Sequence, residues 1–270
     1  MKTTSMKNIK AQRGLSLVEL MIGIAISLII VLFLTAMYFG NRKSSVLQEN
    51  NNRLQEEGRI AMFMIGESIM QGGYGRLISS NLSQNISKLT LTEFQGDAVK
   101  STDGNNLIVR YNKEDNVNAA AGIGVDCAGQ EVAGKVIQNE FYLKGKSLYC
   151  KGNGGDAEQI ILGDERNVNV DNMVIKFGLN GKDSATDLGF YSAEDYVDVA
   201  FVGSNWNRVV SINICLELSS KENNVAHGSS FEYIDCSGEK VTATDGRLHS
   251  VMNTVYTIRN QASARNIAVR

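Results

Sequence analysis

The longest apolar stretch of the chain lies close to its first residue. Residues 15–40 hold a single charged side chain, Glu19, and no other charged residue follows before Arg42. A helix of this length spans about 39 Å at about 1.5 Å per residue, which exceeds the roughly 30 Å hydrocarbon core of a bilayer. The pattern therefore predicts a membrane-spanning helix over residues 15–40 with an acidic side chain inside it.

The apolar pattern becomes amphipathic after Gly40. Apolar side chains recur seven, seven, four and four positions apart, at Leu47, Leu54, Ala61, Ile65 and Ile69. These steps place them on one face of a helix, and the glycines at 72, 73 and 75 then end it. We expect one nearly continuous helix over residues 15–75, whose second part, residues 41–75, forms the spine of a globular domain.

Short alternating runs replace the helical pattern beyond residue 76. The candidate strands are residues 88–94, 107–111, 136–143, 147–151, 159–162, 168–177, 209–218, 231–234 and 248–259. Alternation is typical of half-buried antiparallel strands, and Lys144-Gly145-Lys146 reads as the turn of a hairpin. Because the strands follow one long helix without regular βα alternation, we predict the α+β class, with residues 76–270 as a β-rich domain.

The distribution of charge predicts an orientation in the membrane. Four basic and no acidic residues precede the apolar stretch, namely Lys2, Lys7, Lys10 and Arg13. Only Arg42 and Lys43 follow it before the charges become mixed. The positive-inside rule then leaves the amino terminus in the cytoplasm and sends the β-rich domain across the membrane. The formal net charge of the whole chain is −2, which gives no bulk basic field for nucleic acid.

All four cysteines lie beyond the predicted membrane span, on the side where disulfides form and persist. They are Cys127, Cys150, Cys215 and Cys236, and four cysteines allow three connectivities. Pairing in sequence order would close two short loops, each worth about 3 kcal/mol in the chain-entropy model. A zinc site of four thiolates is the alternative, although the chain has no C-x2-C pair.

The sequence offers little for catalysis. His227 and His249 neighbour no nucleophile motif, and neither G-x-S-x-G nor H-E-x-x-H occurs. Acidic residues between 183 and 198 could offer oxygen ligands to calcium, but their spacing does not fit an EF-hand loop, and a solvated loop is favoured. We predict no enzyme activity, no metal and no cofactor.

The amino-terminal segment resembles the class III signal of type IV pilins and type II secretion pseudopilins. The likeness rests on the basic leader, Gly14, the run Leu15-Ser16-Leu17-Val18-Glu19-Leu20 and the apolar helix after it. It implies that a prepilin peptidase cuts between Gly14 and Leu15, removing residues 1–14, and N-methylates the new terminus. The family usually has phenylalanine where this chain has Leu15. Either Met1 or Met6 could start the leader.

Glu19 acquires a role from this resemblance. A carboxylate near the end of a membrane span can reach the interfacial water, but an acid inside the membrane is costly without a partner. Cleavage would create an α-amine at Leu15, and the amine of a neighbouring subunit could pair with Glu19 during assembly.

Three further segments resemble PilW-family minor pilins. They are residues 54–75, 205–218 and 245–261. Family members often carry a cysteine shortly after the position of Tyr74, where this chain has Gly75 and Arg76. Its absence removes one family pairing and favours the sequential disulfides, Cys127 with Cys150 and Cys215 with Cys236.

The resemblance implies a minor pilin of a type IV pilus. Such a subunit would join other minor pilins in a tip complex that primes assembly of the major pilin and supports a tip adhesin, in twitching motility and adhesion. It would begin in the inner membrane and end at the pilus tip. One alternative is a J-type minor pseudopilin of type II secretion. Another is a DNA receptor at the tip, using Lys144, Lys146 and Lys151. The competing interpretation of these lysines is a solvated sheet edge that they protect against pairing with another strand.

Overall fold

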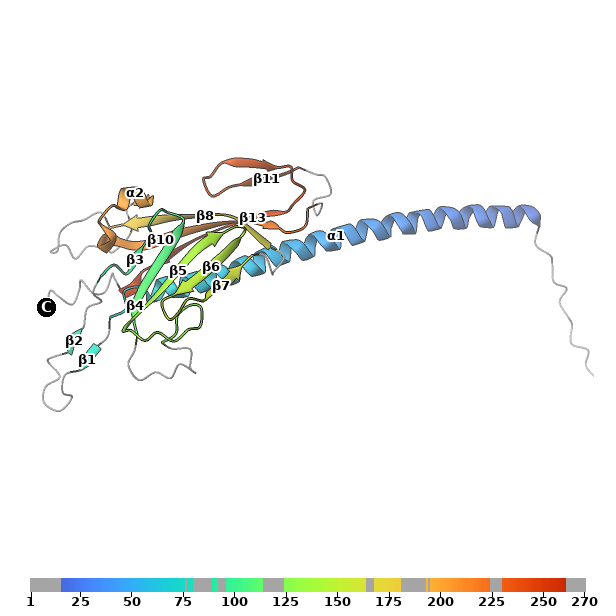
Figure 1. The fold of residues 1–270 in the computed structure, drawn as a ribbon. Helices are drawn as coiled ribbons and strands as arrows, with labels where there is room; N and C mark the ends of the chain where they lie inside the picture. Colours follow the sequence, from blue (N-terminus) through green and yellow to red (C-terminus); the bar gives the residue numbers. More distant parts are fainter. Residues whose placement is uncertain are drawn as a thin grey trace, which may run out of the picture. The chain divides into compact units, whose positions relative to one another are not determined.

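The computed structural model describes residues 16–75, 77–79, 89–91, 96–113, 124–163, 168–180, 193, 195–223 and 230–260. The chain divides into two units, residues 1–48 and residues 49–270. Each unit is described by itself. Figure 1 shows the helices and strands, coloured along the sequence.

One helix, α1, covers Leu17–Gln71, a length of 55 residues that agrees with the expected long helix. It ends at Gln71 rather than at residue 75, because Gly73 adopts a positive φ of 73° that ordinary helical residues avoid. The Gly73 N–H instead donates to the Arg110 carbonyl at 2.9 Å. The glycines therefore terminate the helix and direct the chain to the first large sheet.

The second unit contains two large antiparallel sheets. The first has the order β3-β4-β5-β6-β7, a meander of neighbouring strands. Its strands are β3 (Val99–Lys100), β4 (Asn106–Asn112), β5 (Val136–Lys144), β6 (Ser147–Gly152) and β7 (Glu158–Leu162). The second has the order β13-β10-β8-β9. Its strands are β13 (His249–Thr257), β10 (Val209–Ser220), β8 (Val168–Leu179) and β9 (Asp195–Val197).

Smaller elements complete the described chain. Two pairs of short strands form separate two-stranded sheets. They are β1 (Leu77–Ser79) with β2 (Leu89–Leu91), and β11 (Phe231–Ile234) with β12 (Lys240–Ala243). A short helix, α2 (Val199–Val202), and a 3-10 turn, Trp206–Arg208, connect β9 to β10.

The core lies between the carboxyl-terminal part of α1 and the inner faces of both large sheets, as the cyan part of α1 in Figure 1 illustrates. Four residues of the predicted helical stripe are at most 1% exposed, namely Leu54, Ala61, Ile65 and Ile69. Phe141 of the first sheet and Phe177 of the second are equally buried. Burying such large side chains contributes roughly 1.5–3 kcal/mol each, so this layer is the main source of stability.

The predicted strands agree with the structure to within about two residues at most ends. The even-numbered residues of β10, from Ile212 to Leu218, are fully buried on one face, as their alternation predicts. The β5–β6 hairpin turns at two residues, Gly145 and Lys146, with Gly145 at a φ of 66°. The last strand stops at Thr257, before a short helical turn. Within the expected strand 88–94, residues 88 and 92–94 lie outside the described residues.

Four short strands and one short helix of the second unit were not predicted. They are β1, β3, β9, β12 and α2, each two to four residues long. Runs this short carry no readable period, so the pairing partner rather than the local sequence determines them.

Candidate functional site

The first unit presents an apolar helical surface. Every large apolar side chain from Leu17 to Phe39 is 51–74% exposed. Within the described chain, α1 is a helix long and apolar enough to cross a membrane. Such a surface is stable only against lipid or against other apolar helices.

The polar groups inside this surface differ in how they are satisfied. Ser27 Oγ donates to the Ile24 carbonyl at 2.9 Å, and Thr35 Oγ1 donates to the Val31 carbonyl at 2.7 Å. These hydroxyls therefore bring no unpaired donor into an apolar environment. The Glu19 carboxylate, in contrast, has no hydrogen bond or ion pair with any residue that the structure describes.

Glu19 lies in the first turn of α1, where a negative charge interacts favourably with the helix dipole. That interaction is worth only about 0.3–1 kcal/mol at an exposed site, less than the cost of burying a carboxylate in lipid. Glu19 therefore still requires a further partner if it is to be buried among apolar groups, as its position in the sequence indicated. Gly14 and Leu15, the predicted cleavage residues, lie outside the described residues.

The two disulfides pair the cysteines in sequence order. Cys127 is bonded to Cys150, which ties the segment before β5 to β6, and Cys215 is bonded to Cys236, which ties β10 to the turn between β11 and β12. Cys150 and Cys215 are buried, so both bonds have one end in the core. The cysteines thus stabilise long connections of the second unit, and no thiol remains for zinc.

A buried carboxylate reinforces the first disulfide. Asp126, 4% exposed, accepts hydrogen bonds from three backbone N–H groups. The donors belong to Ala128, Gln130 and Gly154, at 2.7–3.0 Å. The carboxylate is thereby satisfied without a cation. Asp126 therefore holds the segment 126–130 against the turn after β6 and has a structural role.

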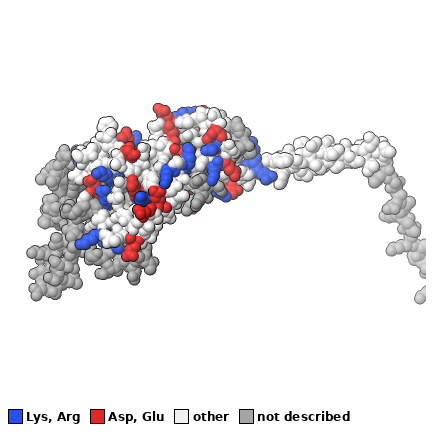
Figure 2. All heavy atoms as spheres, in the orientation of Figure 1, with Lys and Arg blue, Asp and Glu red and all other residues white. Residues whose placement is uncertain are grey.

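Two lysines of the DNA-receptor alternative are already paired. Lys144 Nζ lies 3.0 Å from Glu158 Oε2, and Lys146 Nζ lies 2.7 Å from Asp171 Oδ1. The Glu158 carboxylate accepts a hydrogen bond from Lys144, which raises the pKa of the lysine. Figure 2 shows basic and acidic side chains interspersed on the visible face of the second unit. These lysines therefore form no uninterrupted basic surface.

His249 lies among acidic and aromatic side chains. Its Nε2 atom is 3.2 Å from Asp245 Oδ1, and its ring stacks on Tyr233 at 4.9 Å between centroids. This contact anchors the β11–β12 pair to β13. Among the described residues no group of three His, Cys, Asp or Glu side chains is placed to hold a metal ion. Asp195 and Asp198 of the acidic segment are exposed, whereas His227 lies outside the described residues.

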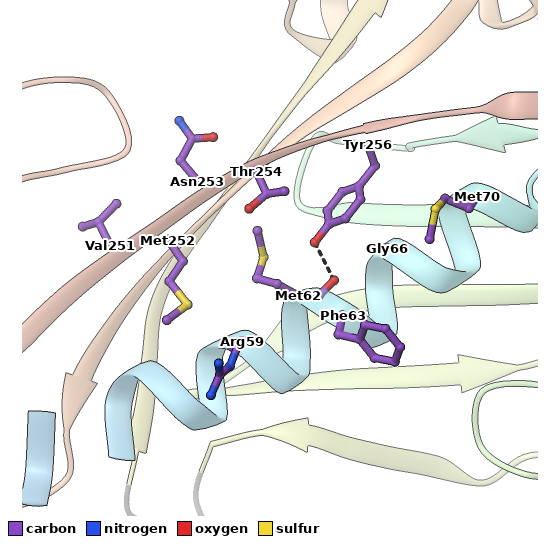
Figure 3. Close-up of a pocket in the computed structure, with 10 residues that line it drawn as sticks. All are labelled: Arg59, Met62, Phe63, Gly66, Met70, Val251, Met252, Asn253, Thr254 and Tyr256. Carbon is purple, nitrogen blue, oxygen red and sulfur yellow. Dashed lines mark hydrogen bonds between the residues drawn. The ribbon is translucent and has the colours of Figure 1, made fainter. Parts of the chain in front are cut away.

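A groove that the sequence did not predict lies between α1 and β13. Figure 3 shows it, with Arg59, Phe63 and Met70 on the helix opposite Val251 and Tyr256 on the strand. Its volume is about 500 Å³. The Tyr256 hydroxyl donates to the Met62 carbonyl at 2.7 Å, which fixes the strand against the helix.

Two glycines of α1 make this close approach possible. A Cβ atom at Gly66 would lie 2.3 Å from Cε1 of Tyr256, and one at Gly58 would lie 2.5 Å from Sδ of Met252. The glycines are eight residues apart and therefore share one face of the helix. Their spacing within an otherwise helix-favouring segment is the sequence signal that could have indicated the contact.

Two family models match parts of the chain. Residues 129–260 match the family described as type IV pilus-assembly protein W, PilW, and residues 9–35 match the prokaryotic N-terminal methylation motif. No curated protein matches the chain.

Among solved structures, the chain is similar to the type IV-like pilin TTHA1219 from Thermus thermophilus. The two are 15% identical, with 78% of this chain and 98% of that chain covered and a TM-score of 0.44.

The two family matches cover separate parts of the sequence. The methylation motif includes Glu19 and the start of the apolar helix, and the PilW match runs from just after Cys127 through β13. Together with the long apolar helix and the disulfide-bonded antiparallel β domain, these two matches support a type IV minor pilin of the PilW family.

Proposed function

We propose that this minor pilin belongs to a tip complex that primes assembly of the major pilin and supports a tip adhesin, and so serves twitching motility and adhesion. The observation that carries the proposal is Glu19, a carboxylate without a partner among the described residues, in the part of α1 from Leu17 to Phe39, whose other large side chains are apolar and exposed. Such a helix is suited to leave lipid for a bundle of similar helices.

The physical argument concerns the replacement of lipid. Helix association in a membrane depends on van der Waals packing and polar contacts, because lipid tails are as apolar as leucine. The apolar side chains would pack against neighbouring subunits in a filament. Glu19 would pair with the α-amine that a prepilin peptidase creates at Leu15 of a neighbour, once residues 1–14 are removed and the amine is methylated. That ion pair would align the incoming subunit along the helix axis.

The β-rich domain suggests a place at the tip. It comprises about 195 residues after Gly75 and carries two large sheets. A domain of this size suits a cap or adaptor that contacts other minor pilins and an adhesin. Before assembly the chain would sit in the inner membrane with its amino terminus in the cytoplasm, and the two disulfides suit an oxidising periplasm.

Replacement of Glu19 tests the proposal. Glu19→Ala should leave cleavage after Gly14 intact, yet lower recovery of the subunit in sheared pili, because the incoming helix loses its polar contact. Ser27→Ala is the matched control, since Ser27 bonds within its own helix, and it should be recovered like the wild type. Mass spectrometry of the sheared filaments measures both the mature amino terminus and the amount of the subunit. Equal recovery of both variants would contradict the pairing.

The PilW match supports a pilus rather than the J-type pseudopilin of type II secretion. The genes next to this one distinguish the two: pilus and adhesin genes agree with the proposal, and secretion genes do not. The DNA-receptor alternative draws no support from Lys144 and Lys146, which are paired with carboxylates.

A further inference from the structure

The outer edge of β13 offers backbone hydrogen-bonding groups that no described strand uses. The order β13-β10-β8-β9 places β13 at the end of its sheet. At one end of the ladder the Ile258 N–H donates to the Val210 carbonyl, and at the other the Ser220 N–H donates to the Leu248 carbonyl, both at 2.9 Å.

The register between these two bonds is continuous, so the even-numbered residues of β13 face β10. The backbone groups of Val251, Asn253 and Val255 therefore point away from the sheet. Each contributes one N–H donor and one carbonyl acceptor to the outer edge.

Among the residues that the structure describes, this edge lacks the usual protection against pairing. Natural edge strands are commonly short, charged, bulged or interrupted by proline. β13 is nine residues long, has no Lys, Arg, Asp or Glu, and pairs with β10 without a register shift. The other ends of the two large sheets differ: β9 has three residues, β3 has two, and β7 has five, begins with Glu158 and pairs with β6 through a register shift. An edge left this open is suited to receive a strand.

The α1–β13 groove continues along the same edge. A second hollow of about 580 Å³ shares Arg59, Val251 and Met252 with the first and extends it to Asn52. From Asn52 to Met70, α1 rises about 27 Å at about 1.5 Å per residue. An extended segment of about eight residues covers that length at about 3.3 Å per residue.

The charge and polarity of the groove lining indicate which kind of segment it can bind. Arg59 is ion-paired with Glu56, so the lining carries no net charge. The end near Asn52 and Gln55 is polar, whereas Phe63, 64% exposed, and Met70 make the other end apolar. A charged segment would lose hydration there without an opposite charge, which favours an uncharged occupant.

We propose that the α1–β13 groove binds an uncharged extended segment of another pilus subunit, which adds a strand to the outer edge of β13. Its apolar side chains lie at the Phe63 end of the groove and its polar side chains at the Asn52 end. The backbone bonds supply affinity, and the graded lining supplies the direction of the segment. This inference rests on the proposed function, because the partner is a subunit of the same filament.

A pair of substitutions at Val255 tests the strand addition. Val255→Pro removes an outward N–H without touching the bonds to β10, and edge strands tolerate proline. Val255→Thr keeps the N–H and the β-branched shape and is the matched control. We expect recovery of the Val255→Pro chain in sheared filaments to fall about tenfold, the effect of about 1.4 kcal/mol, while the Val255→Thr chain is recovered like the wild type.

Each outcome has a defined meaning. If the wild-type chain is absent from the filaments, the proposed function fails. If it is present and both Val255 variants match it, only the strand addition fails. Folding of each full-length variant is checked by its disulfides and its unfolding midpoint. Should Val255→Pro not fold, Asn253→Lys replaces it, because a lysine on the edge opposes pairing and should give the same loss.

A photocrosslinking amino acid at position 253 identifies the occupant. Crosslinks in assembled pili to alternate residues of an extended, uncharged segment of another subunit support the proposal. Crosslinks to β13 of a second copy, to a helix or to lipid alone overturn it.

Discussion

The contact between Gly66 and Tyr256 allows a sharp test of how α1 is held in the β domain. The perturbation is Gly66→Ala, which adds one methyl group on the face of α1 that meets β13. The new Cβ atom would lie 2.3 Å from Cε1 of Tyr256. Ordinary contact begins at about 3.4 Å, so the ring must move by about 1 Å, away from the position in which its hydroxyl bonds the Met62 carbonyl.

The expected loss of stability follows from three contributions. Overpacking costs about 1–3 kcal/mol, and weakening the Tyr256 hydrogen bond costs about 0.5–1.5 kcal/mol. Alanine returns about 1 kcal/mol of helix propensity. The free energy of unfolding should therefore fall by about 2 kcal/mol, which lowers the midpoint temperature by about 4–8 °C for a chain of this size.

Trp206 provides the assay. It is the single tryptophan of the chain, 5% exposed, and it packs edge-on against Phe177 in the core. Its fluorescence reports urea or thermal unfolding of the full-length protein in detergent micelles. Gly40→Ala is the matched control, because no atom lies within 4 Å of a Cβ placed there, and it should not destabilise.

A double-mutant cycle decides whether the Tyr256 ring is the cause. Tyr256→Val removes the ring and introduces a β-branched residue, which suits a strand, so Gly66→Ala should then be neutral or slightly stabilising. The reasoning is refuted if Gly66→Ala leaves the wild-type midpoint unchanged. It is equally refuted if the loss persists in the Tyr256→Val background.

Two further predictions concern the β domain. Replacing Cys215 and Cys236 together by serine frees a loop that the disulfide closes, and should lower the free energy of unfolding by about 3 kcal/mol, read as a lower urea midpoint; an unchanged midpoint contradicts this. The Tyr142 hydroxyl and then Lys144 hold the pKa of Glu158 below its ordinary value. The stability that ionised Glu158 contributes through these contacts should be present above the pKa of Glu158 in the unfolded chain and lost as pH falls through its pKa in the folded protein. Tyr142→Phe should raise the Glu158 pKa in an NMR titration.

Local pattern was sufficient for the elements that extend over many residues. The helical stripe from Leu54 to Ile69 and the alternation from Ile212 to Leu218 repeat within one segment, so burial followed from the period alone. The turn at Gly145 and the helix stop at Gly73 also followed, because both need a backbone conformation that glycine favours. The methylation motif and Glu19 were likewise readable from a few adjacent residues.

The groove was not readable in this way, because its walls come from opposite ends of the chain. Tyr256 and Met62 are 194 residues apart, and nothing near either residue indicates the other. The same holds for the open edge of β13, because its place at the end of the sheet depends on which strands pair. The spacing of Gly58 and Gly66 indicated a close contact on one face of α1, but only the packed structure shows that β13 makes this contact.

The sequence by itself determined the long helix, its apolar first part, the acidic residue within it and the α+β class, since periodicity and charge act over a few turns or strands. Only the tertiary structure decided the disulfide partners, the pairing of Lys144 and Lys146 with carboxylates, and the groove beside β13. The physical reason is that these features depend on contacts between distant segments, which form only when burial of the shared core brings those segments together.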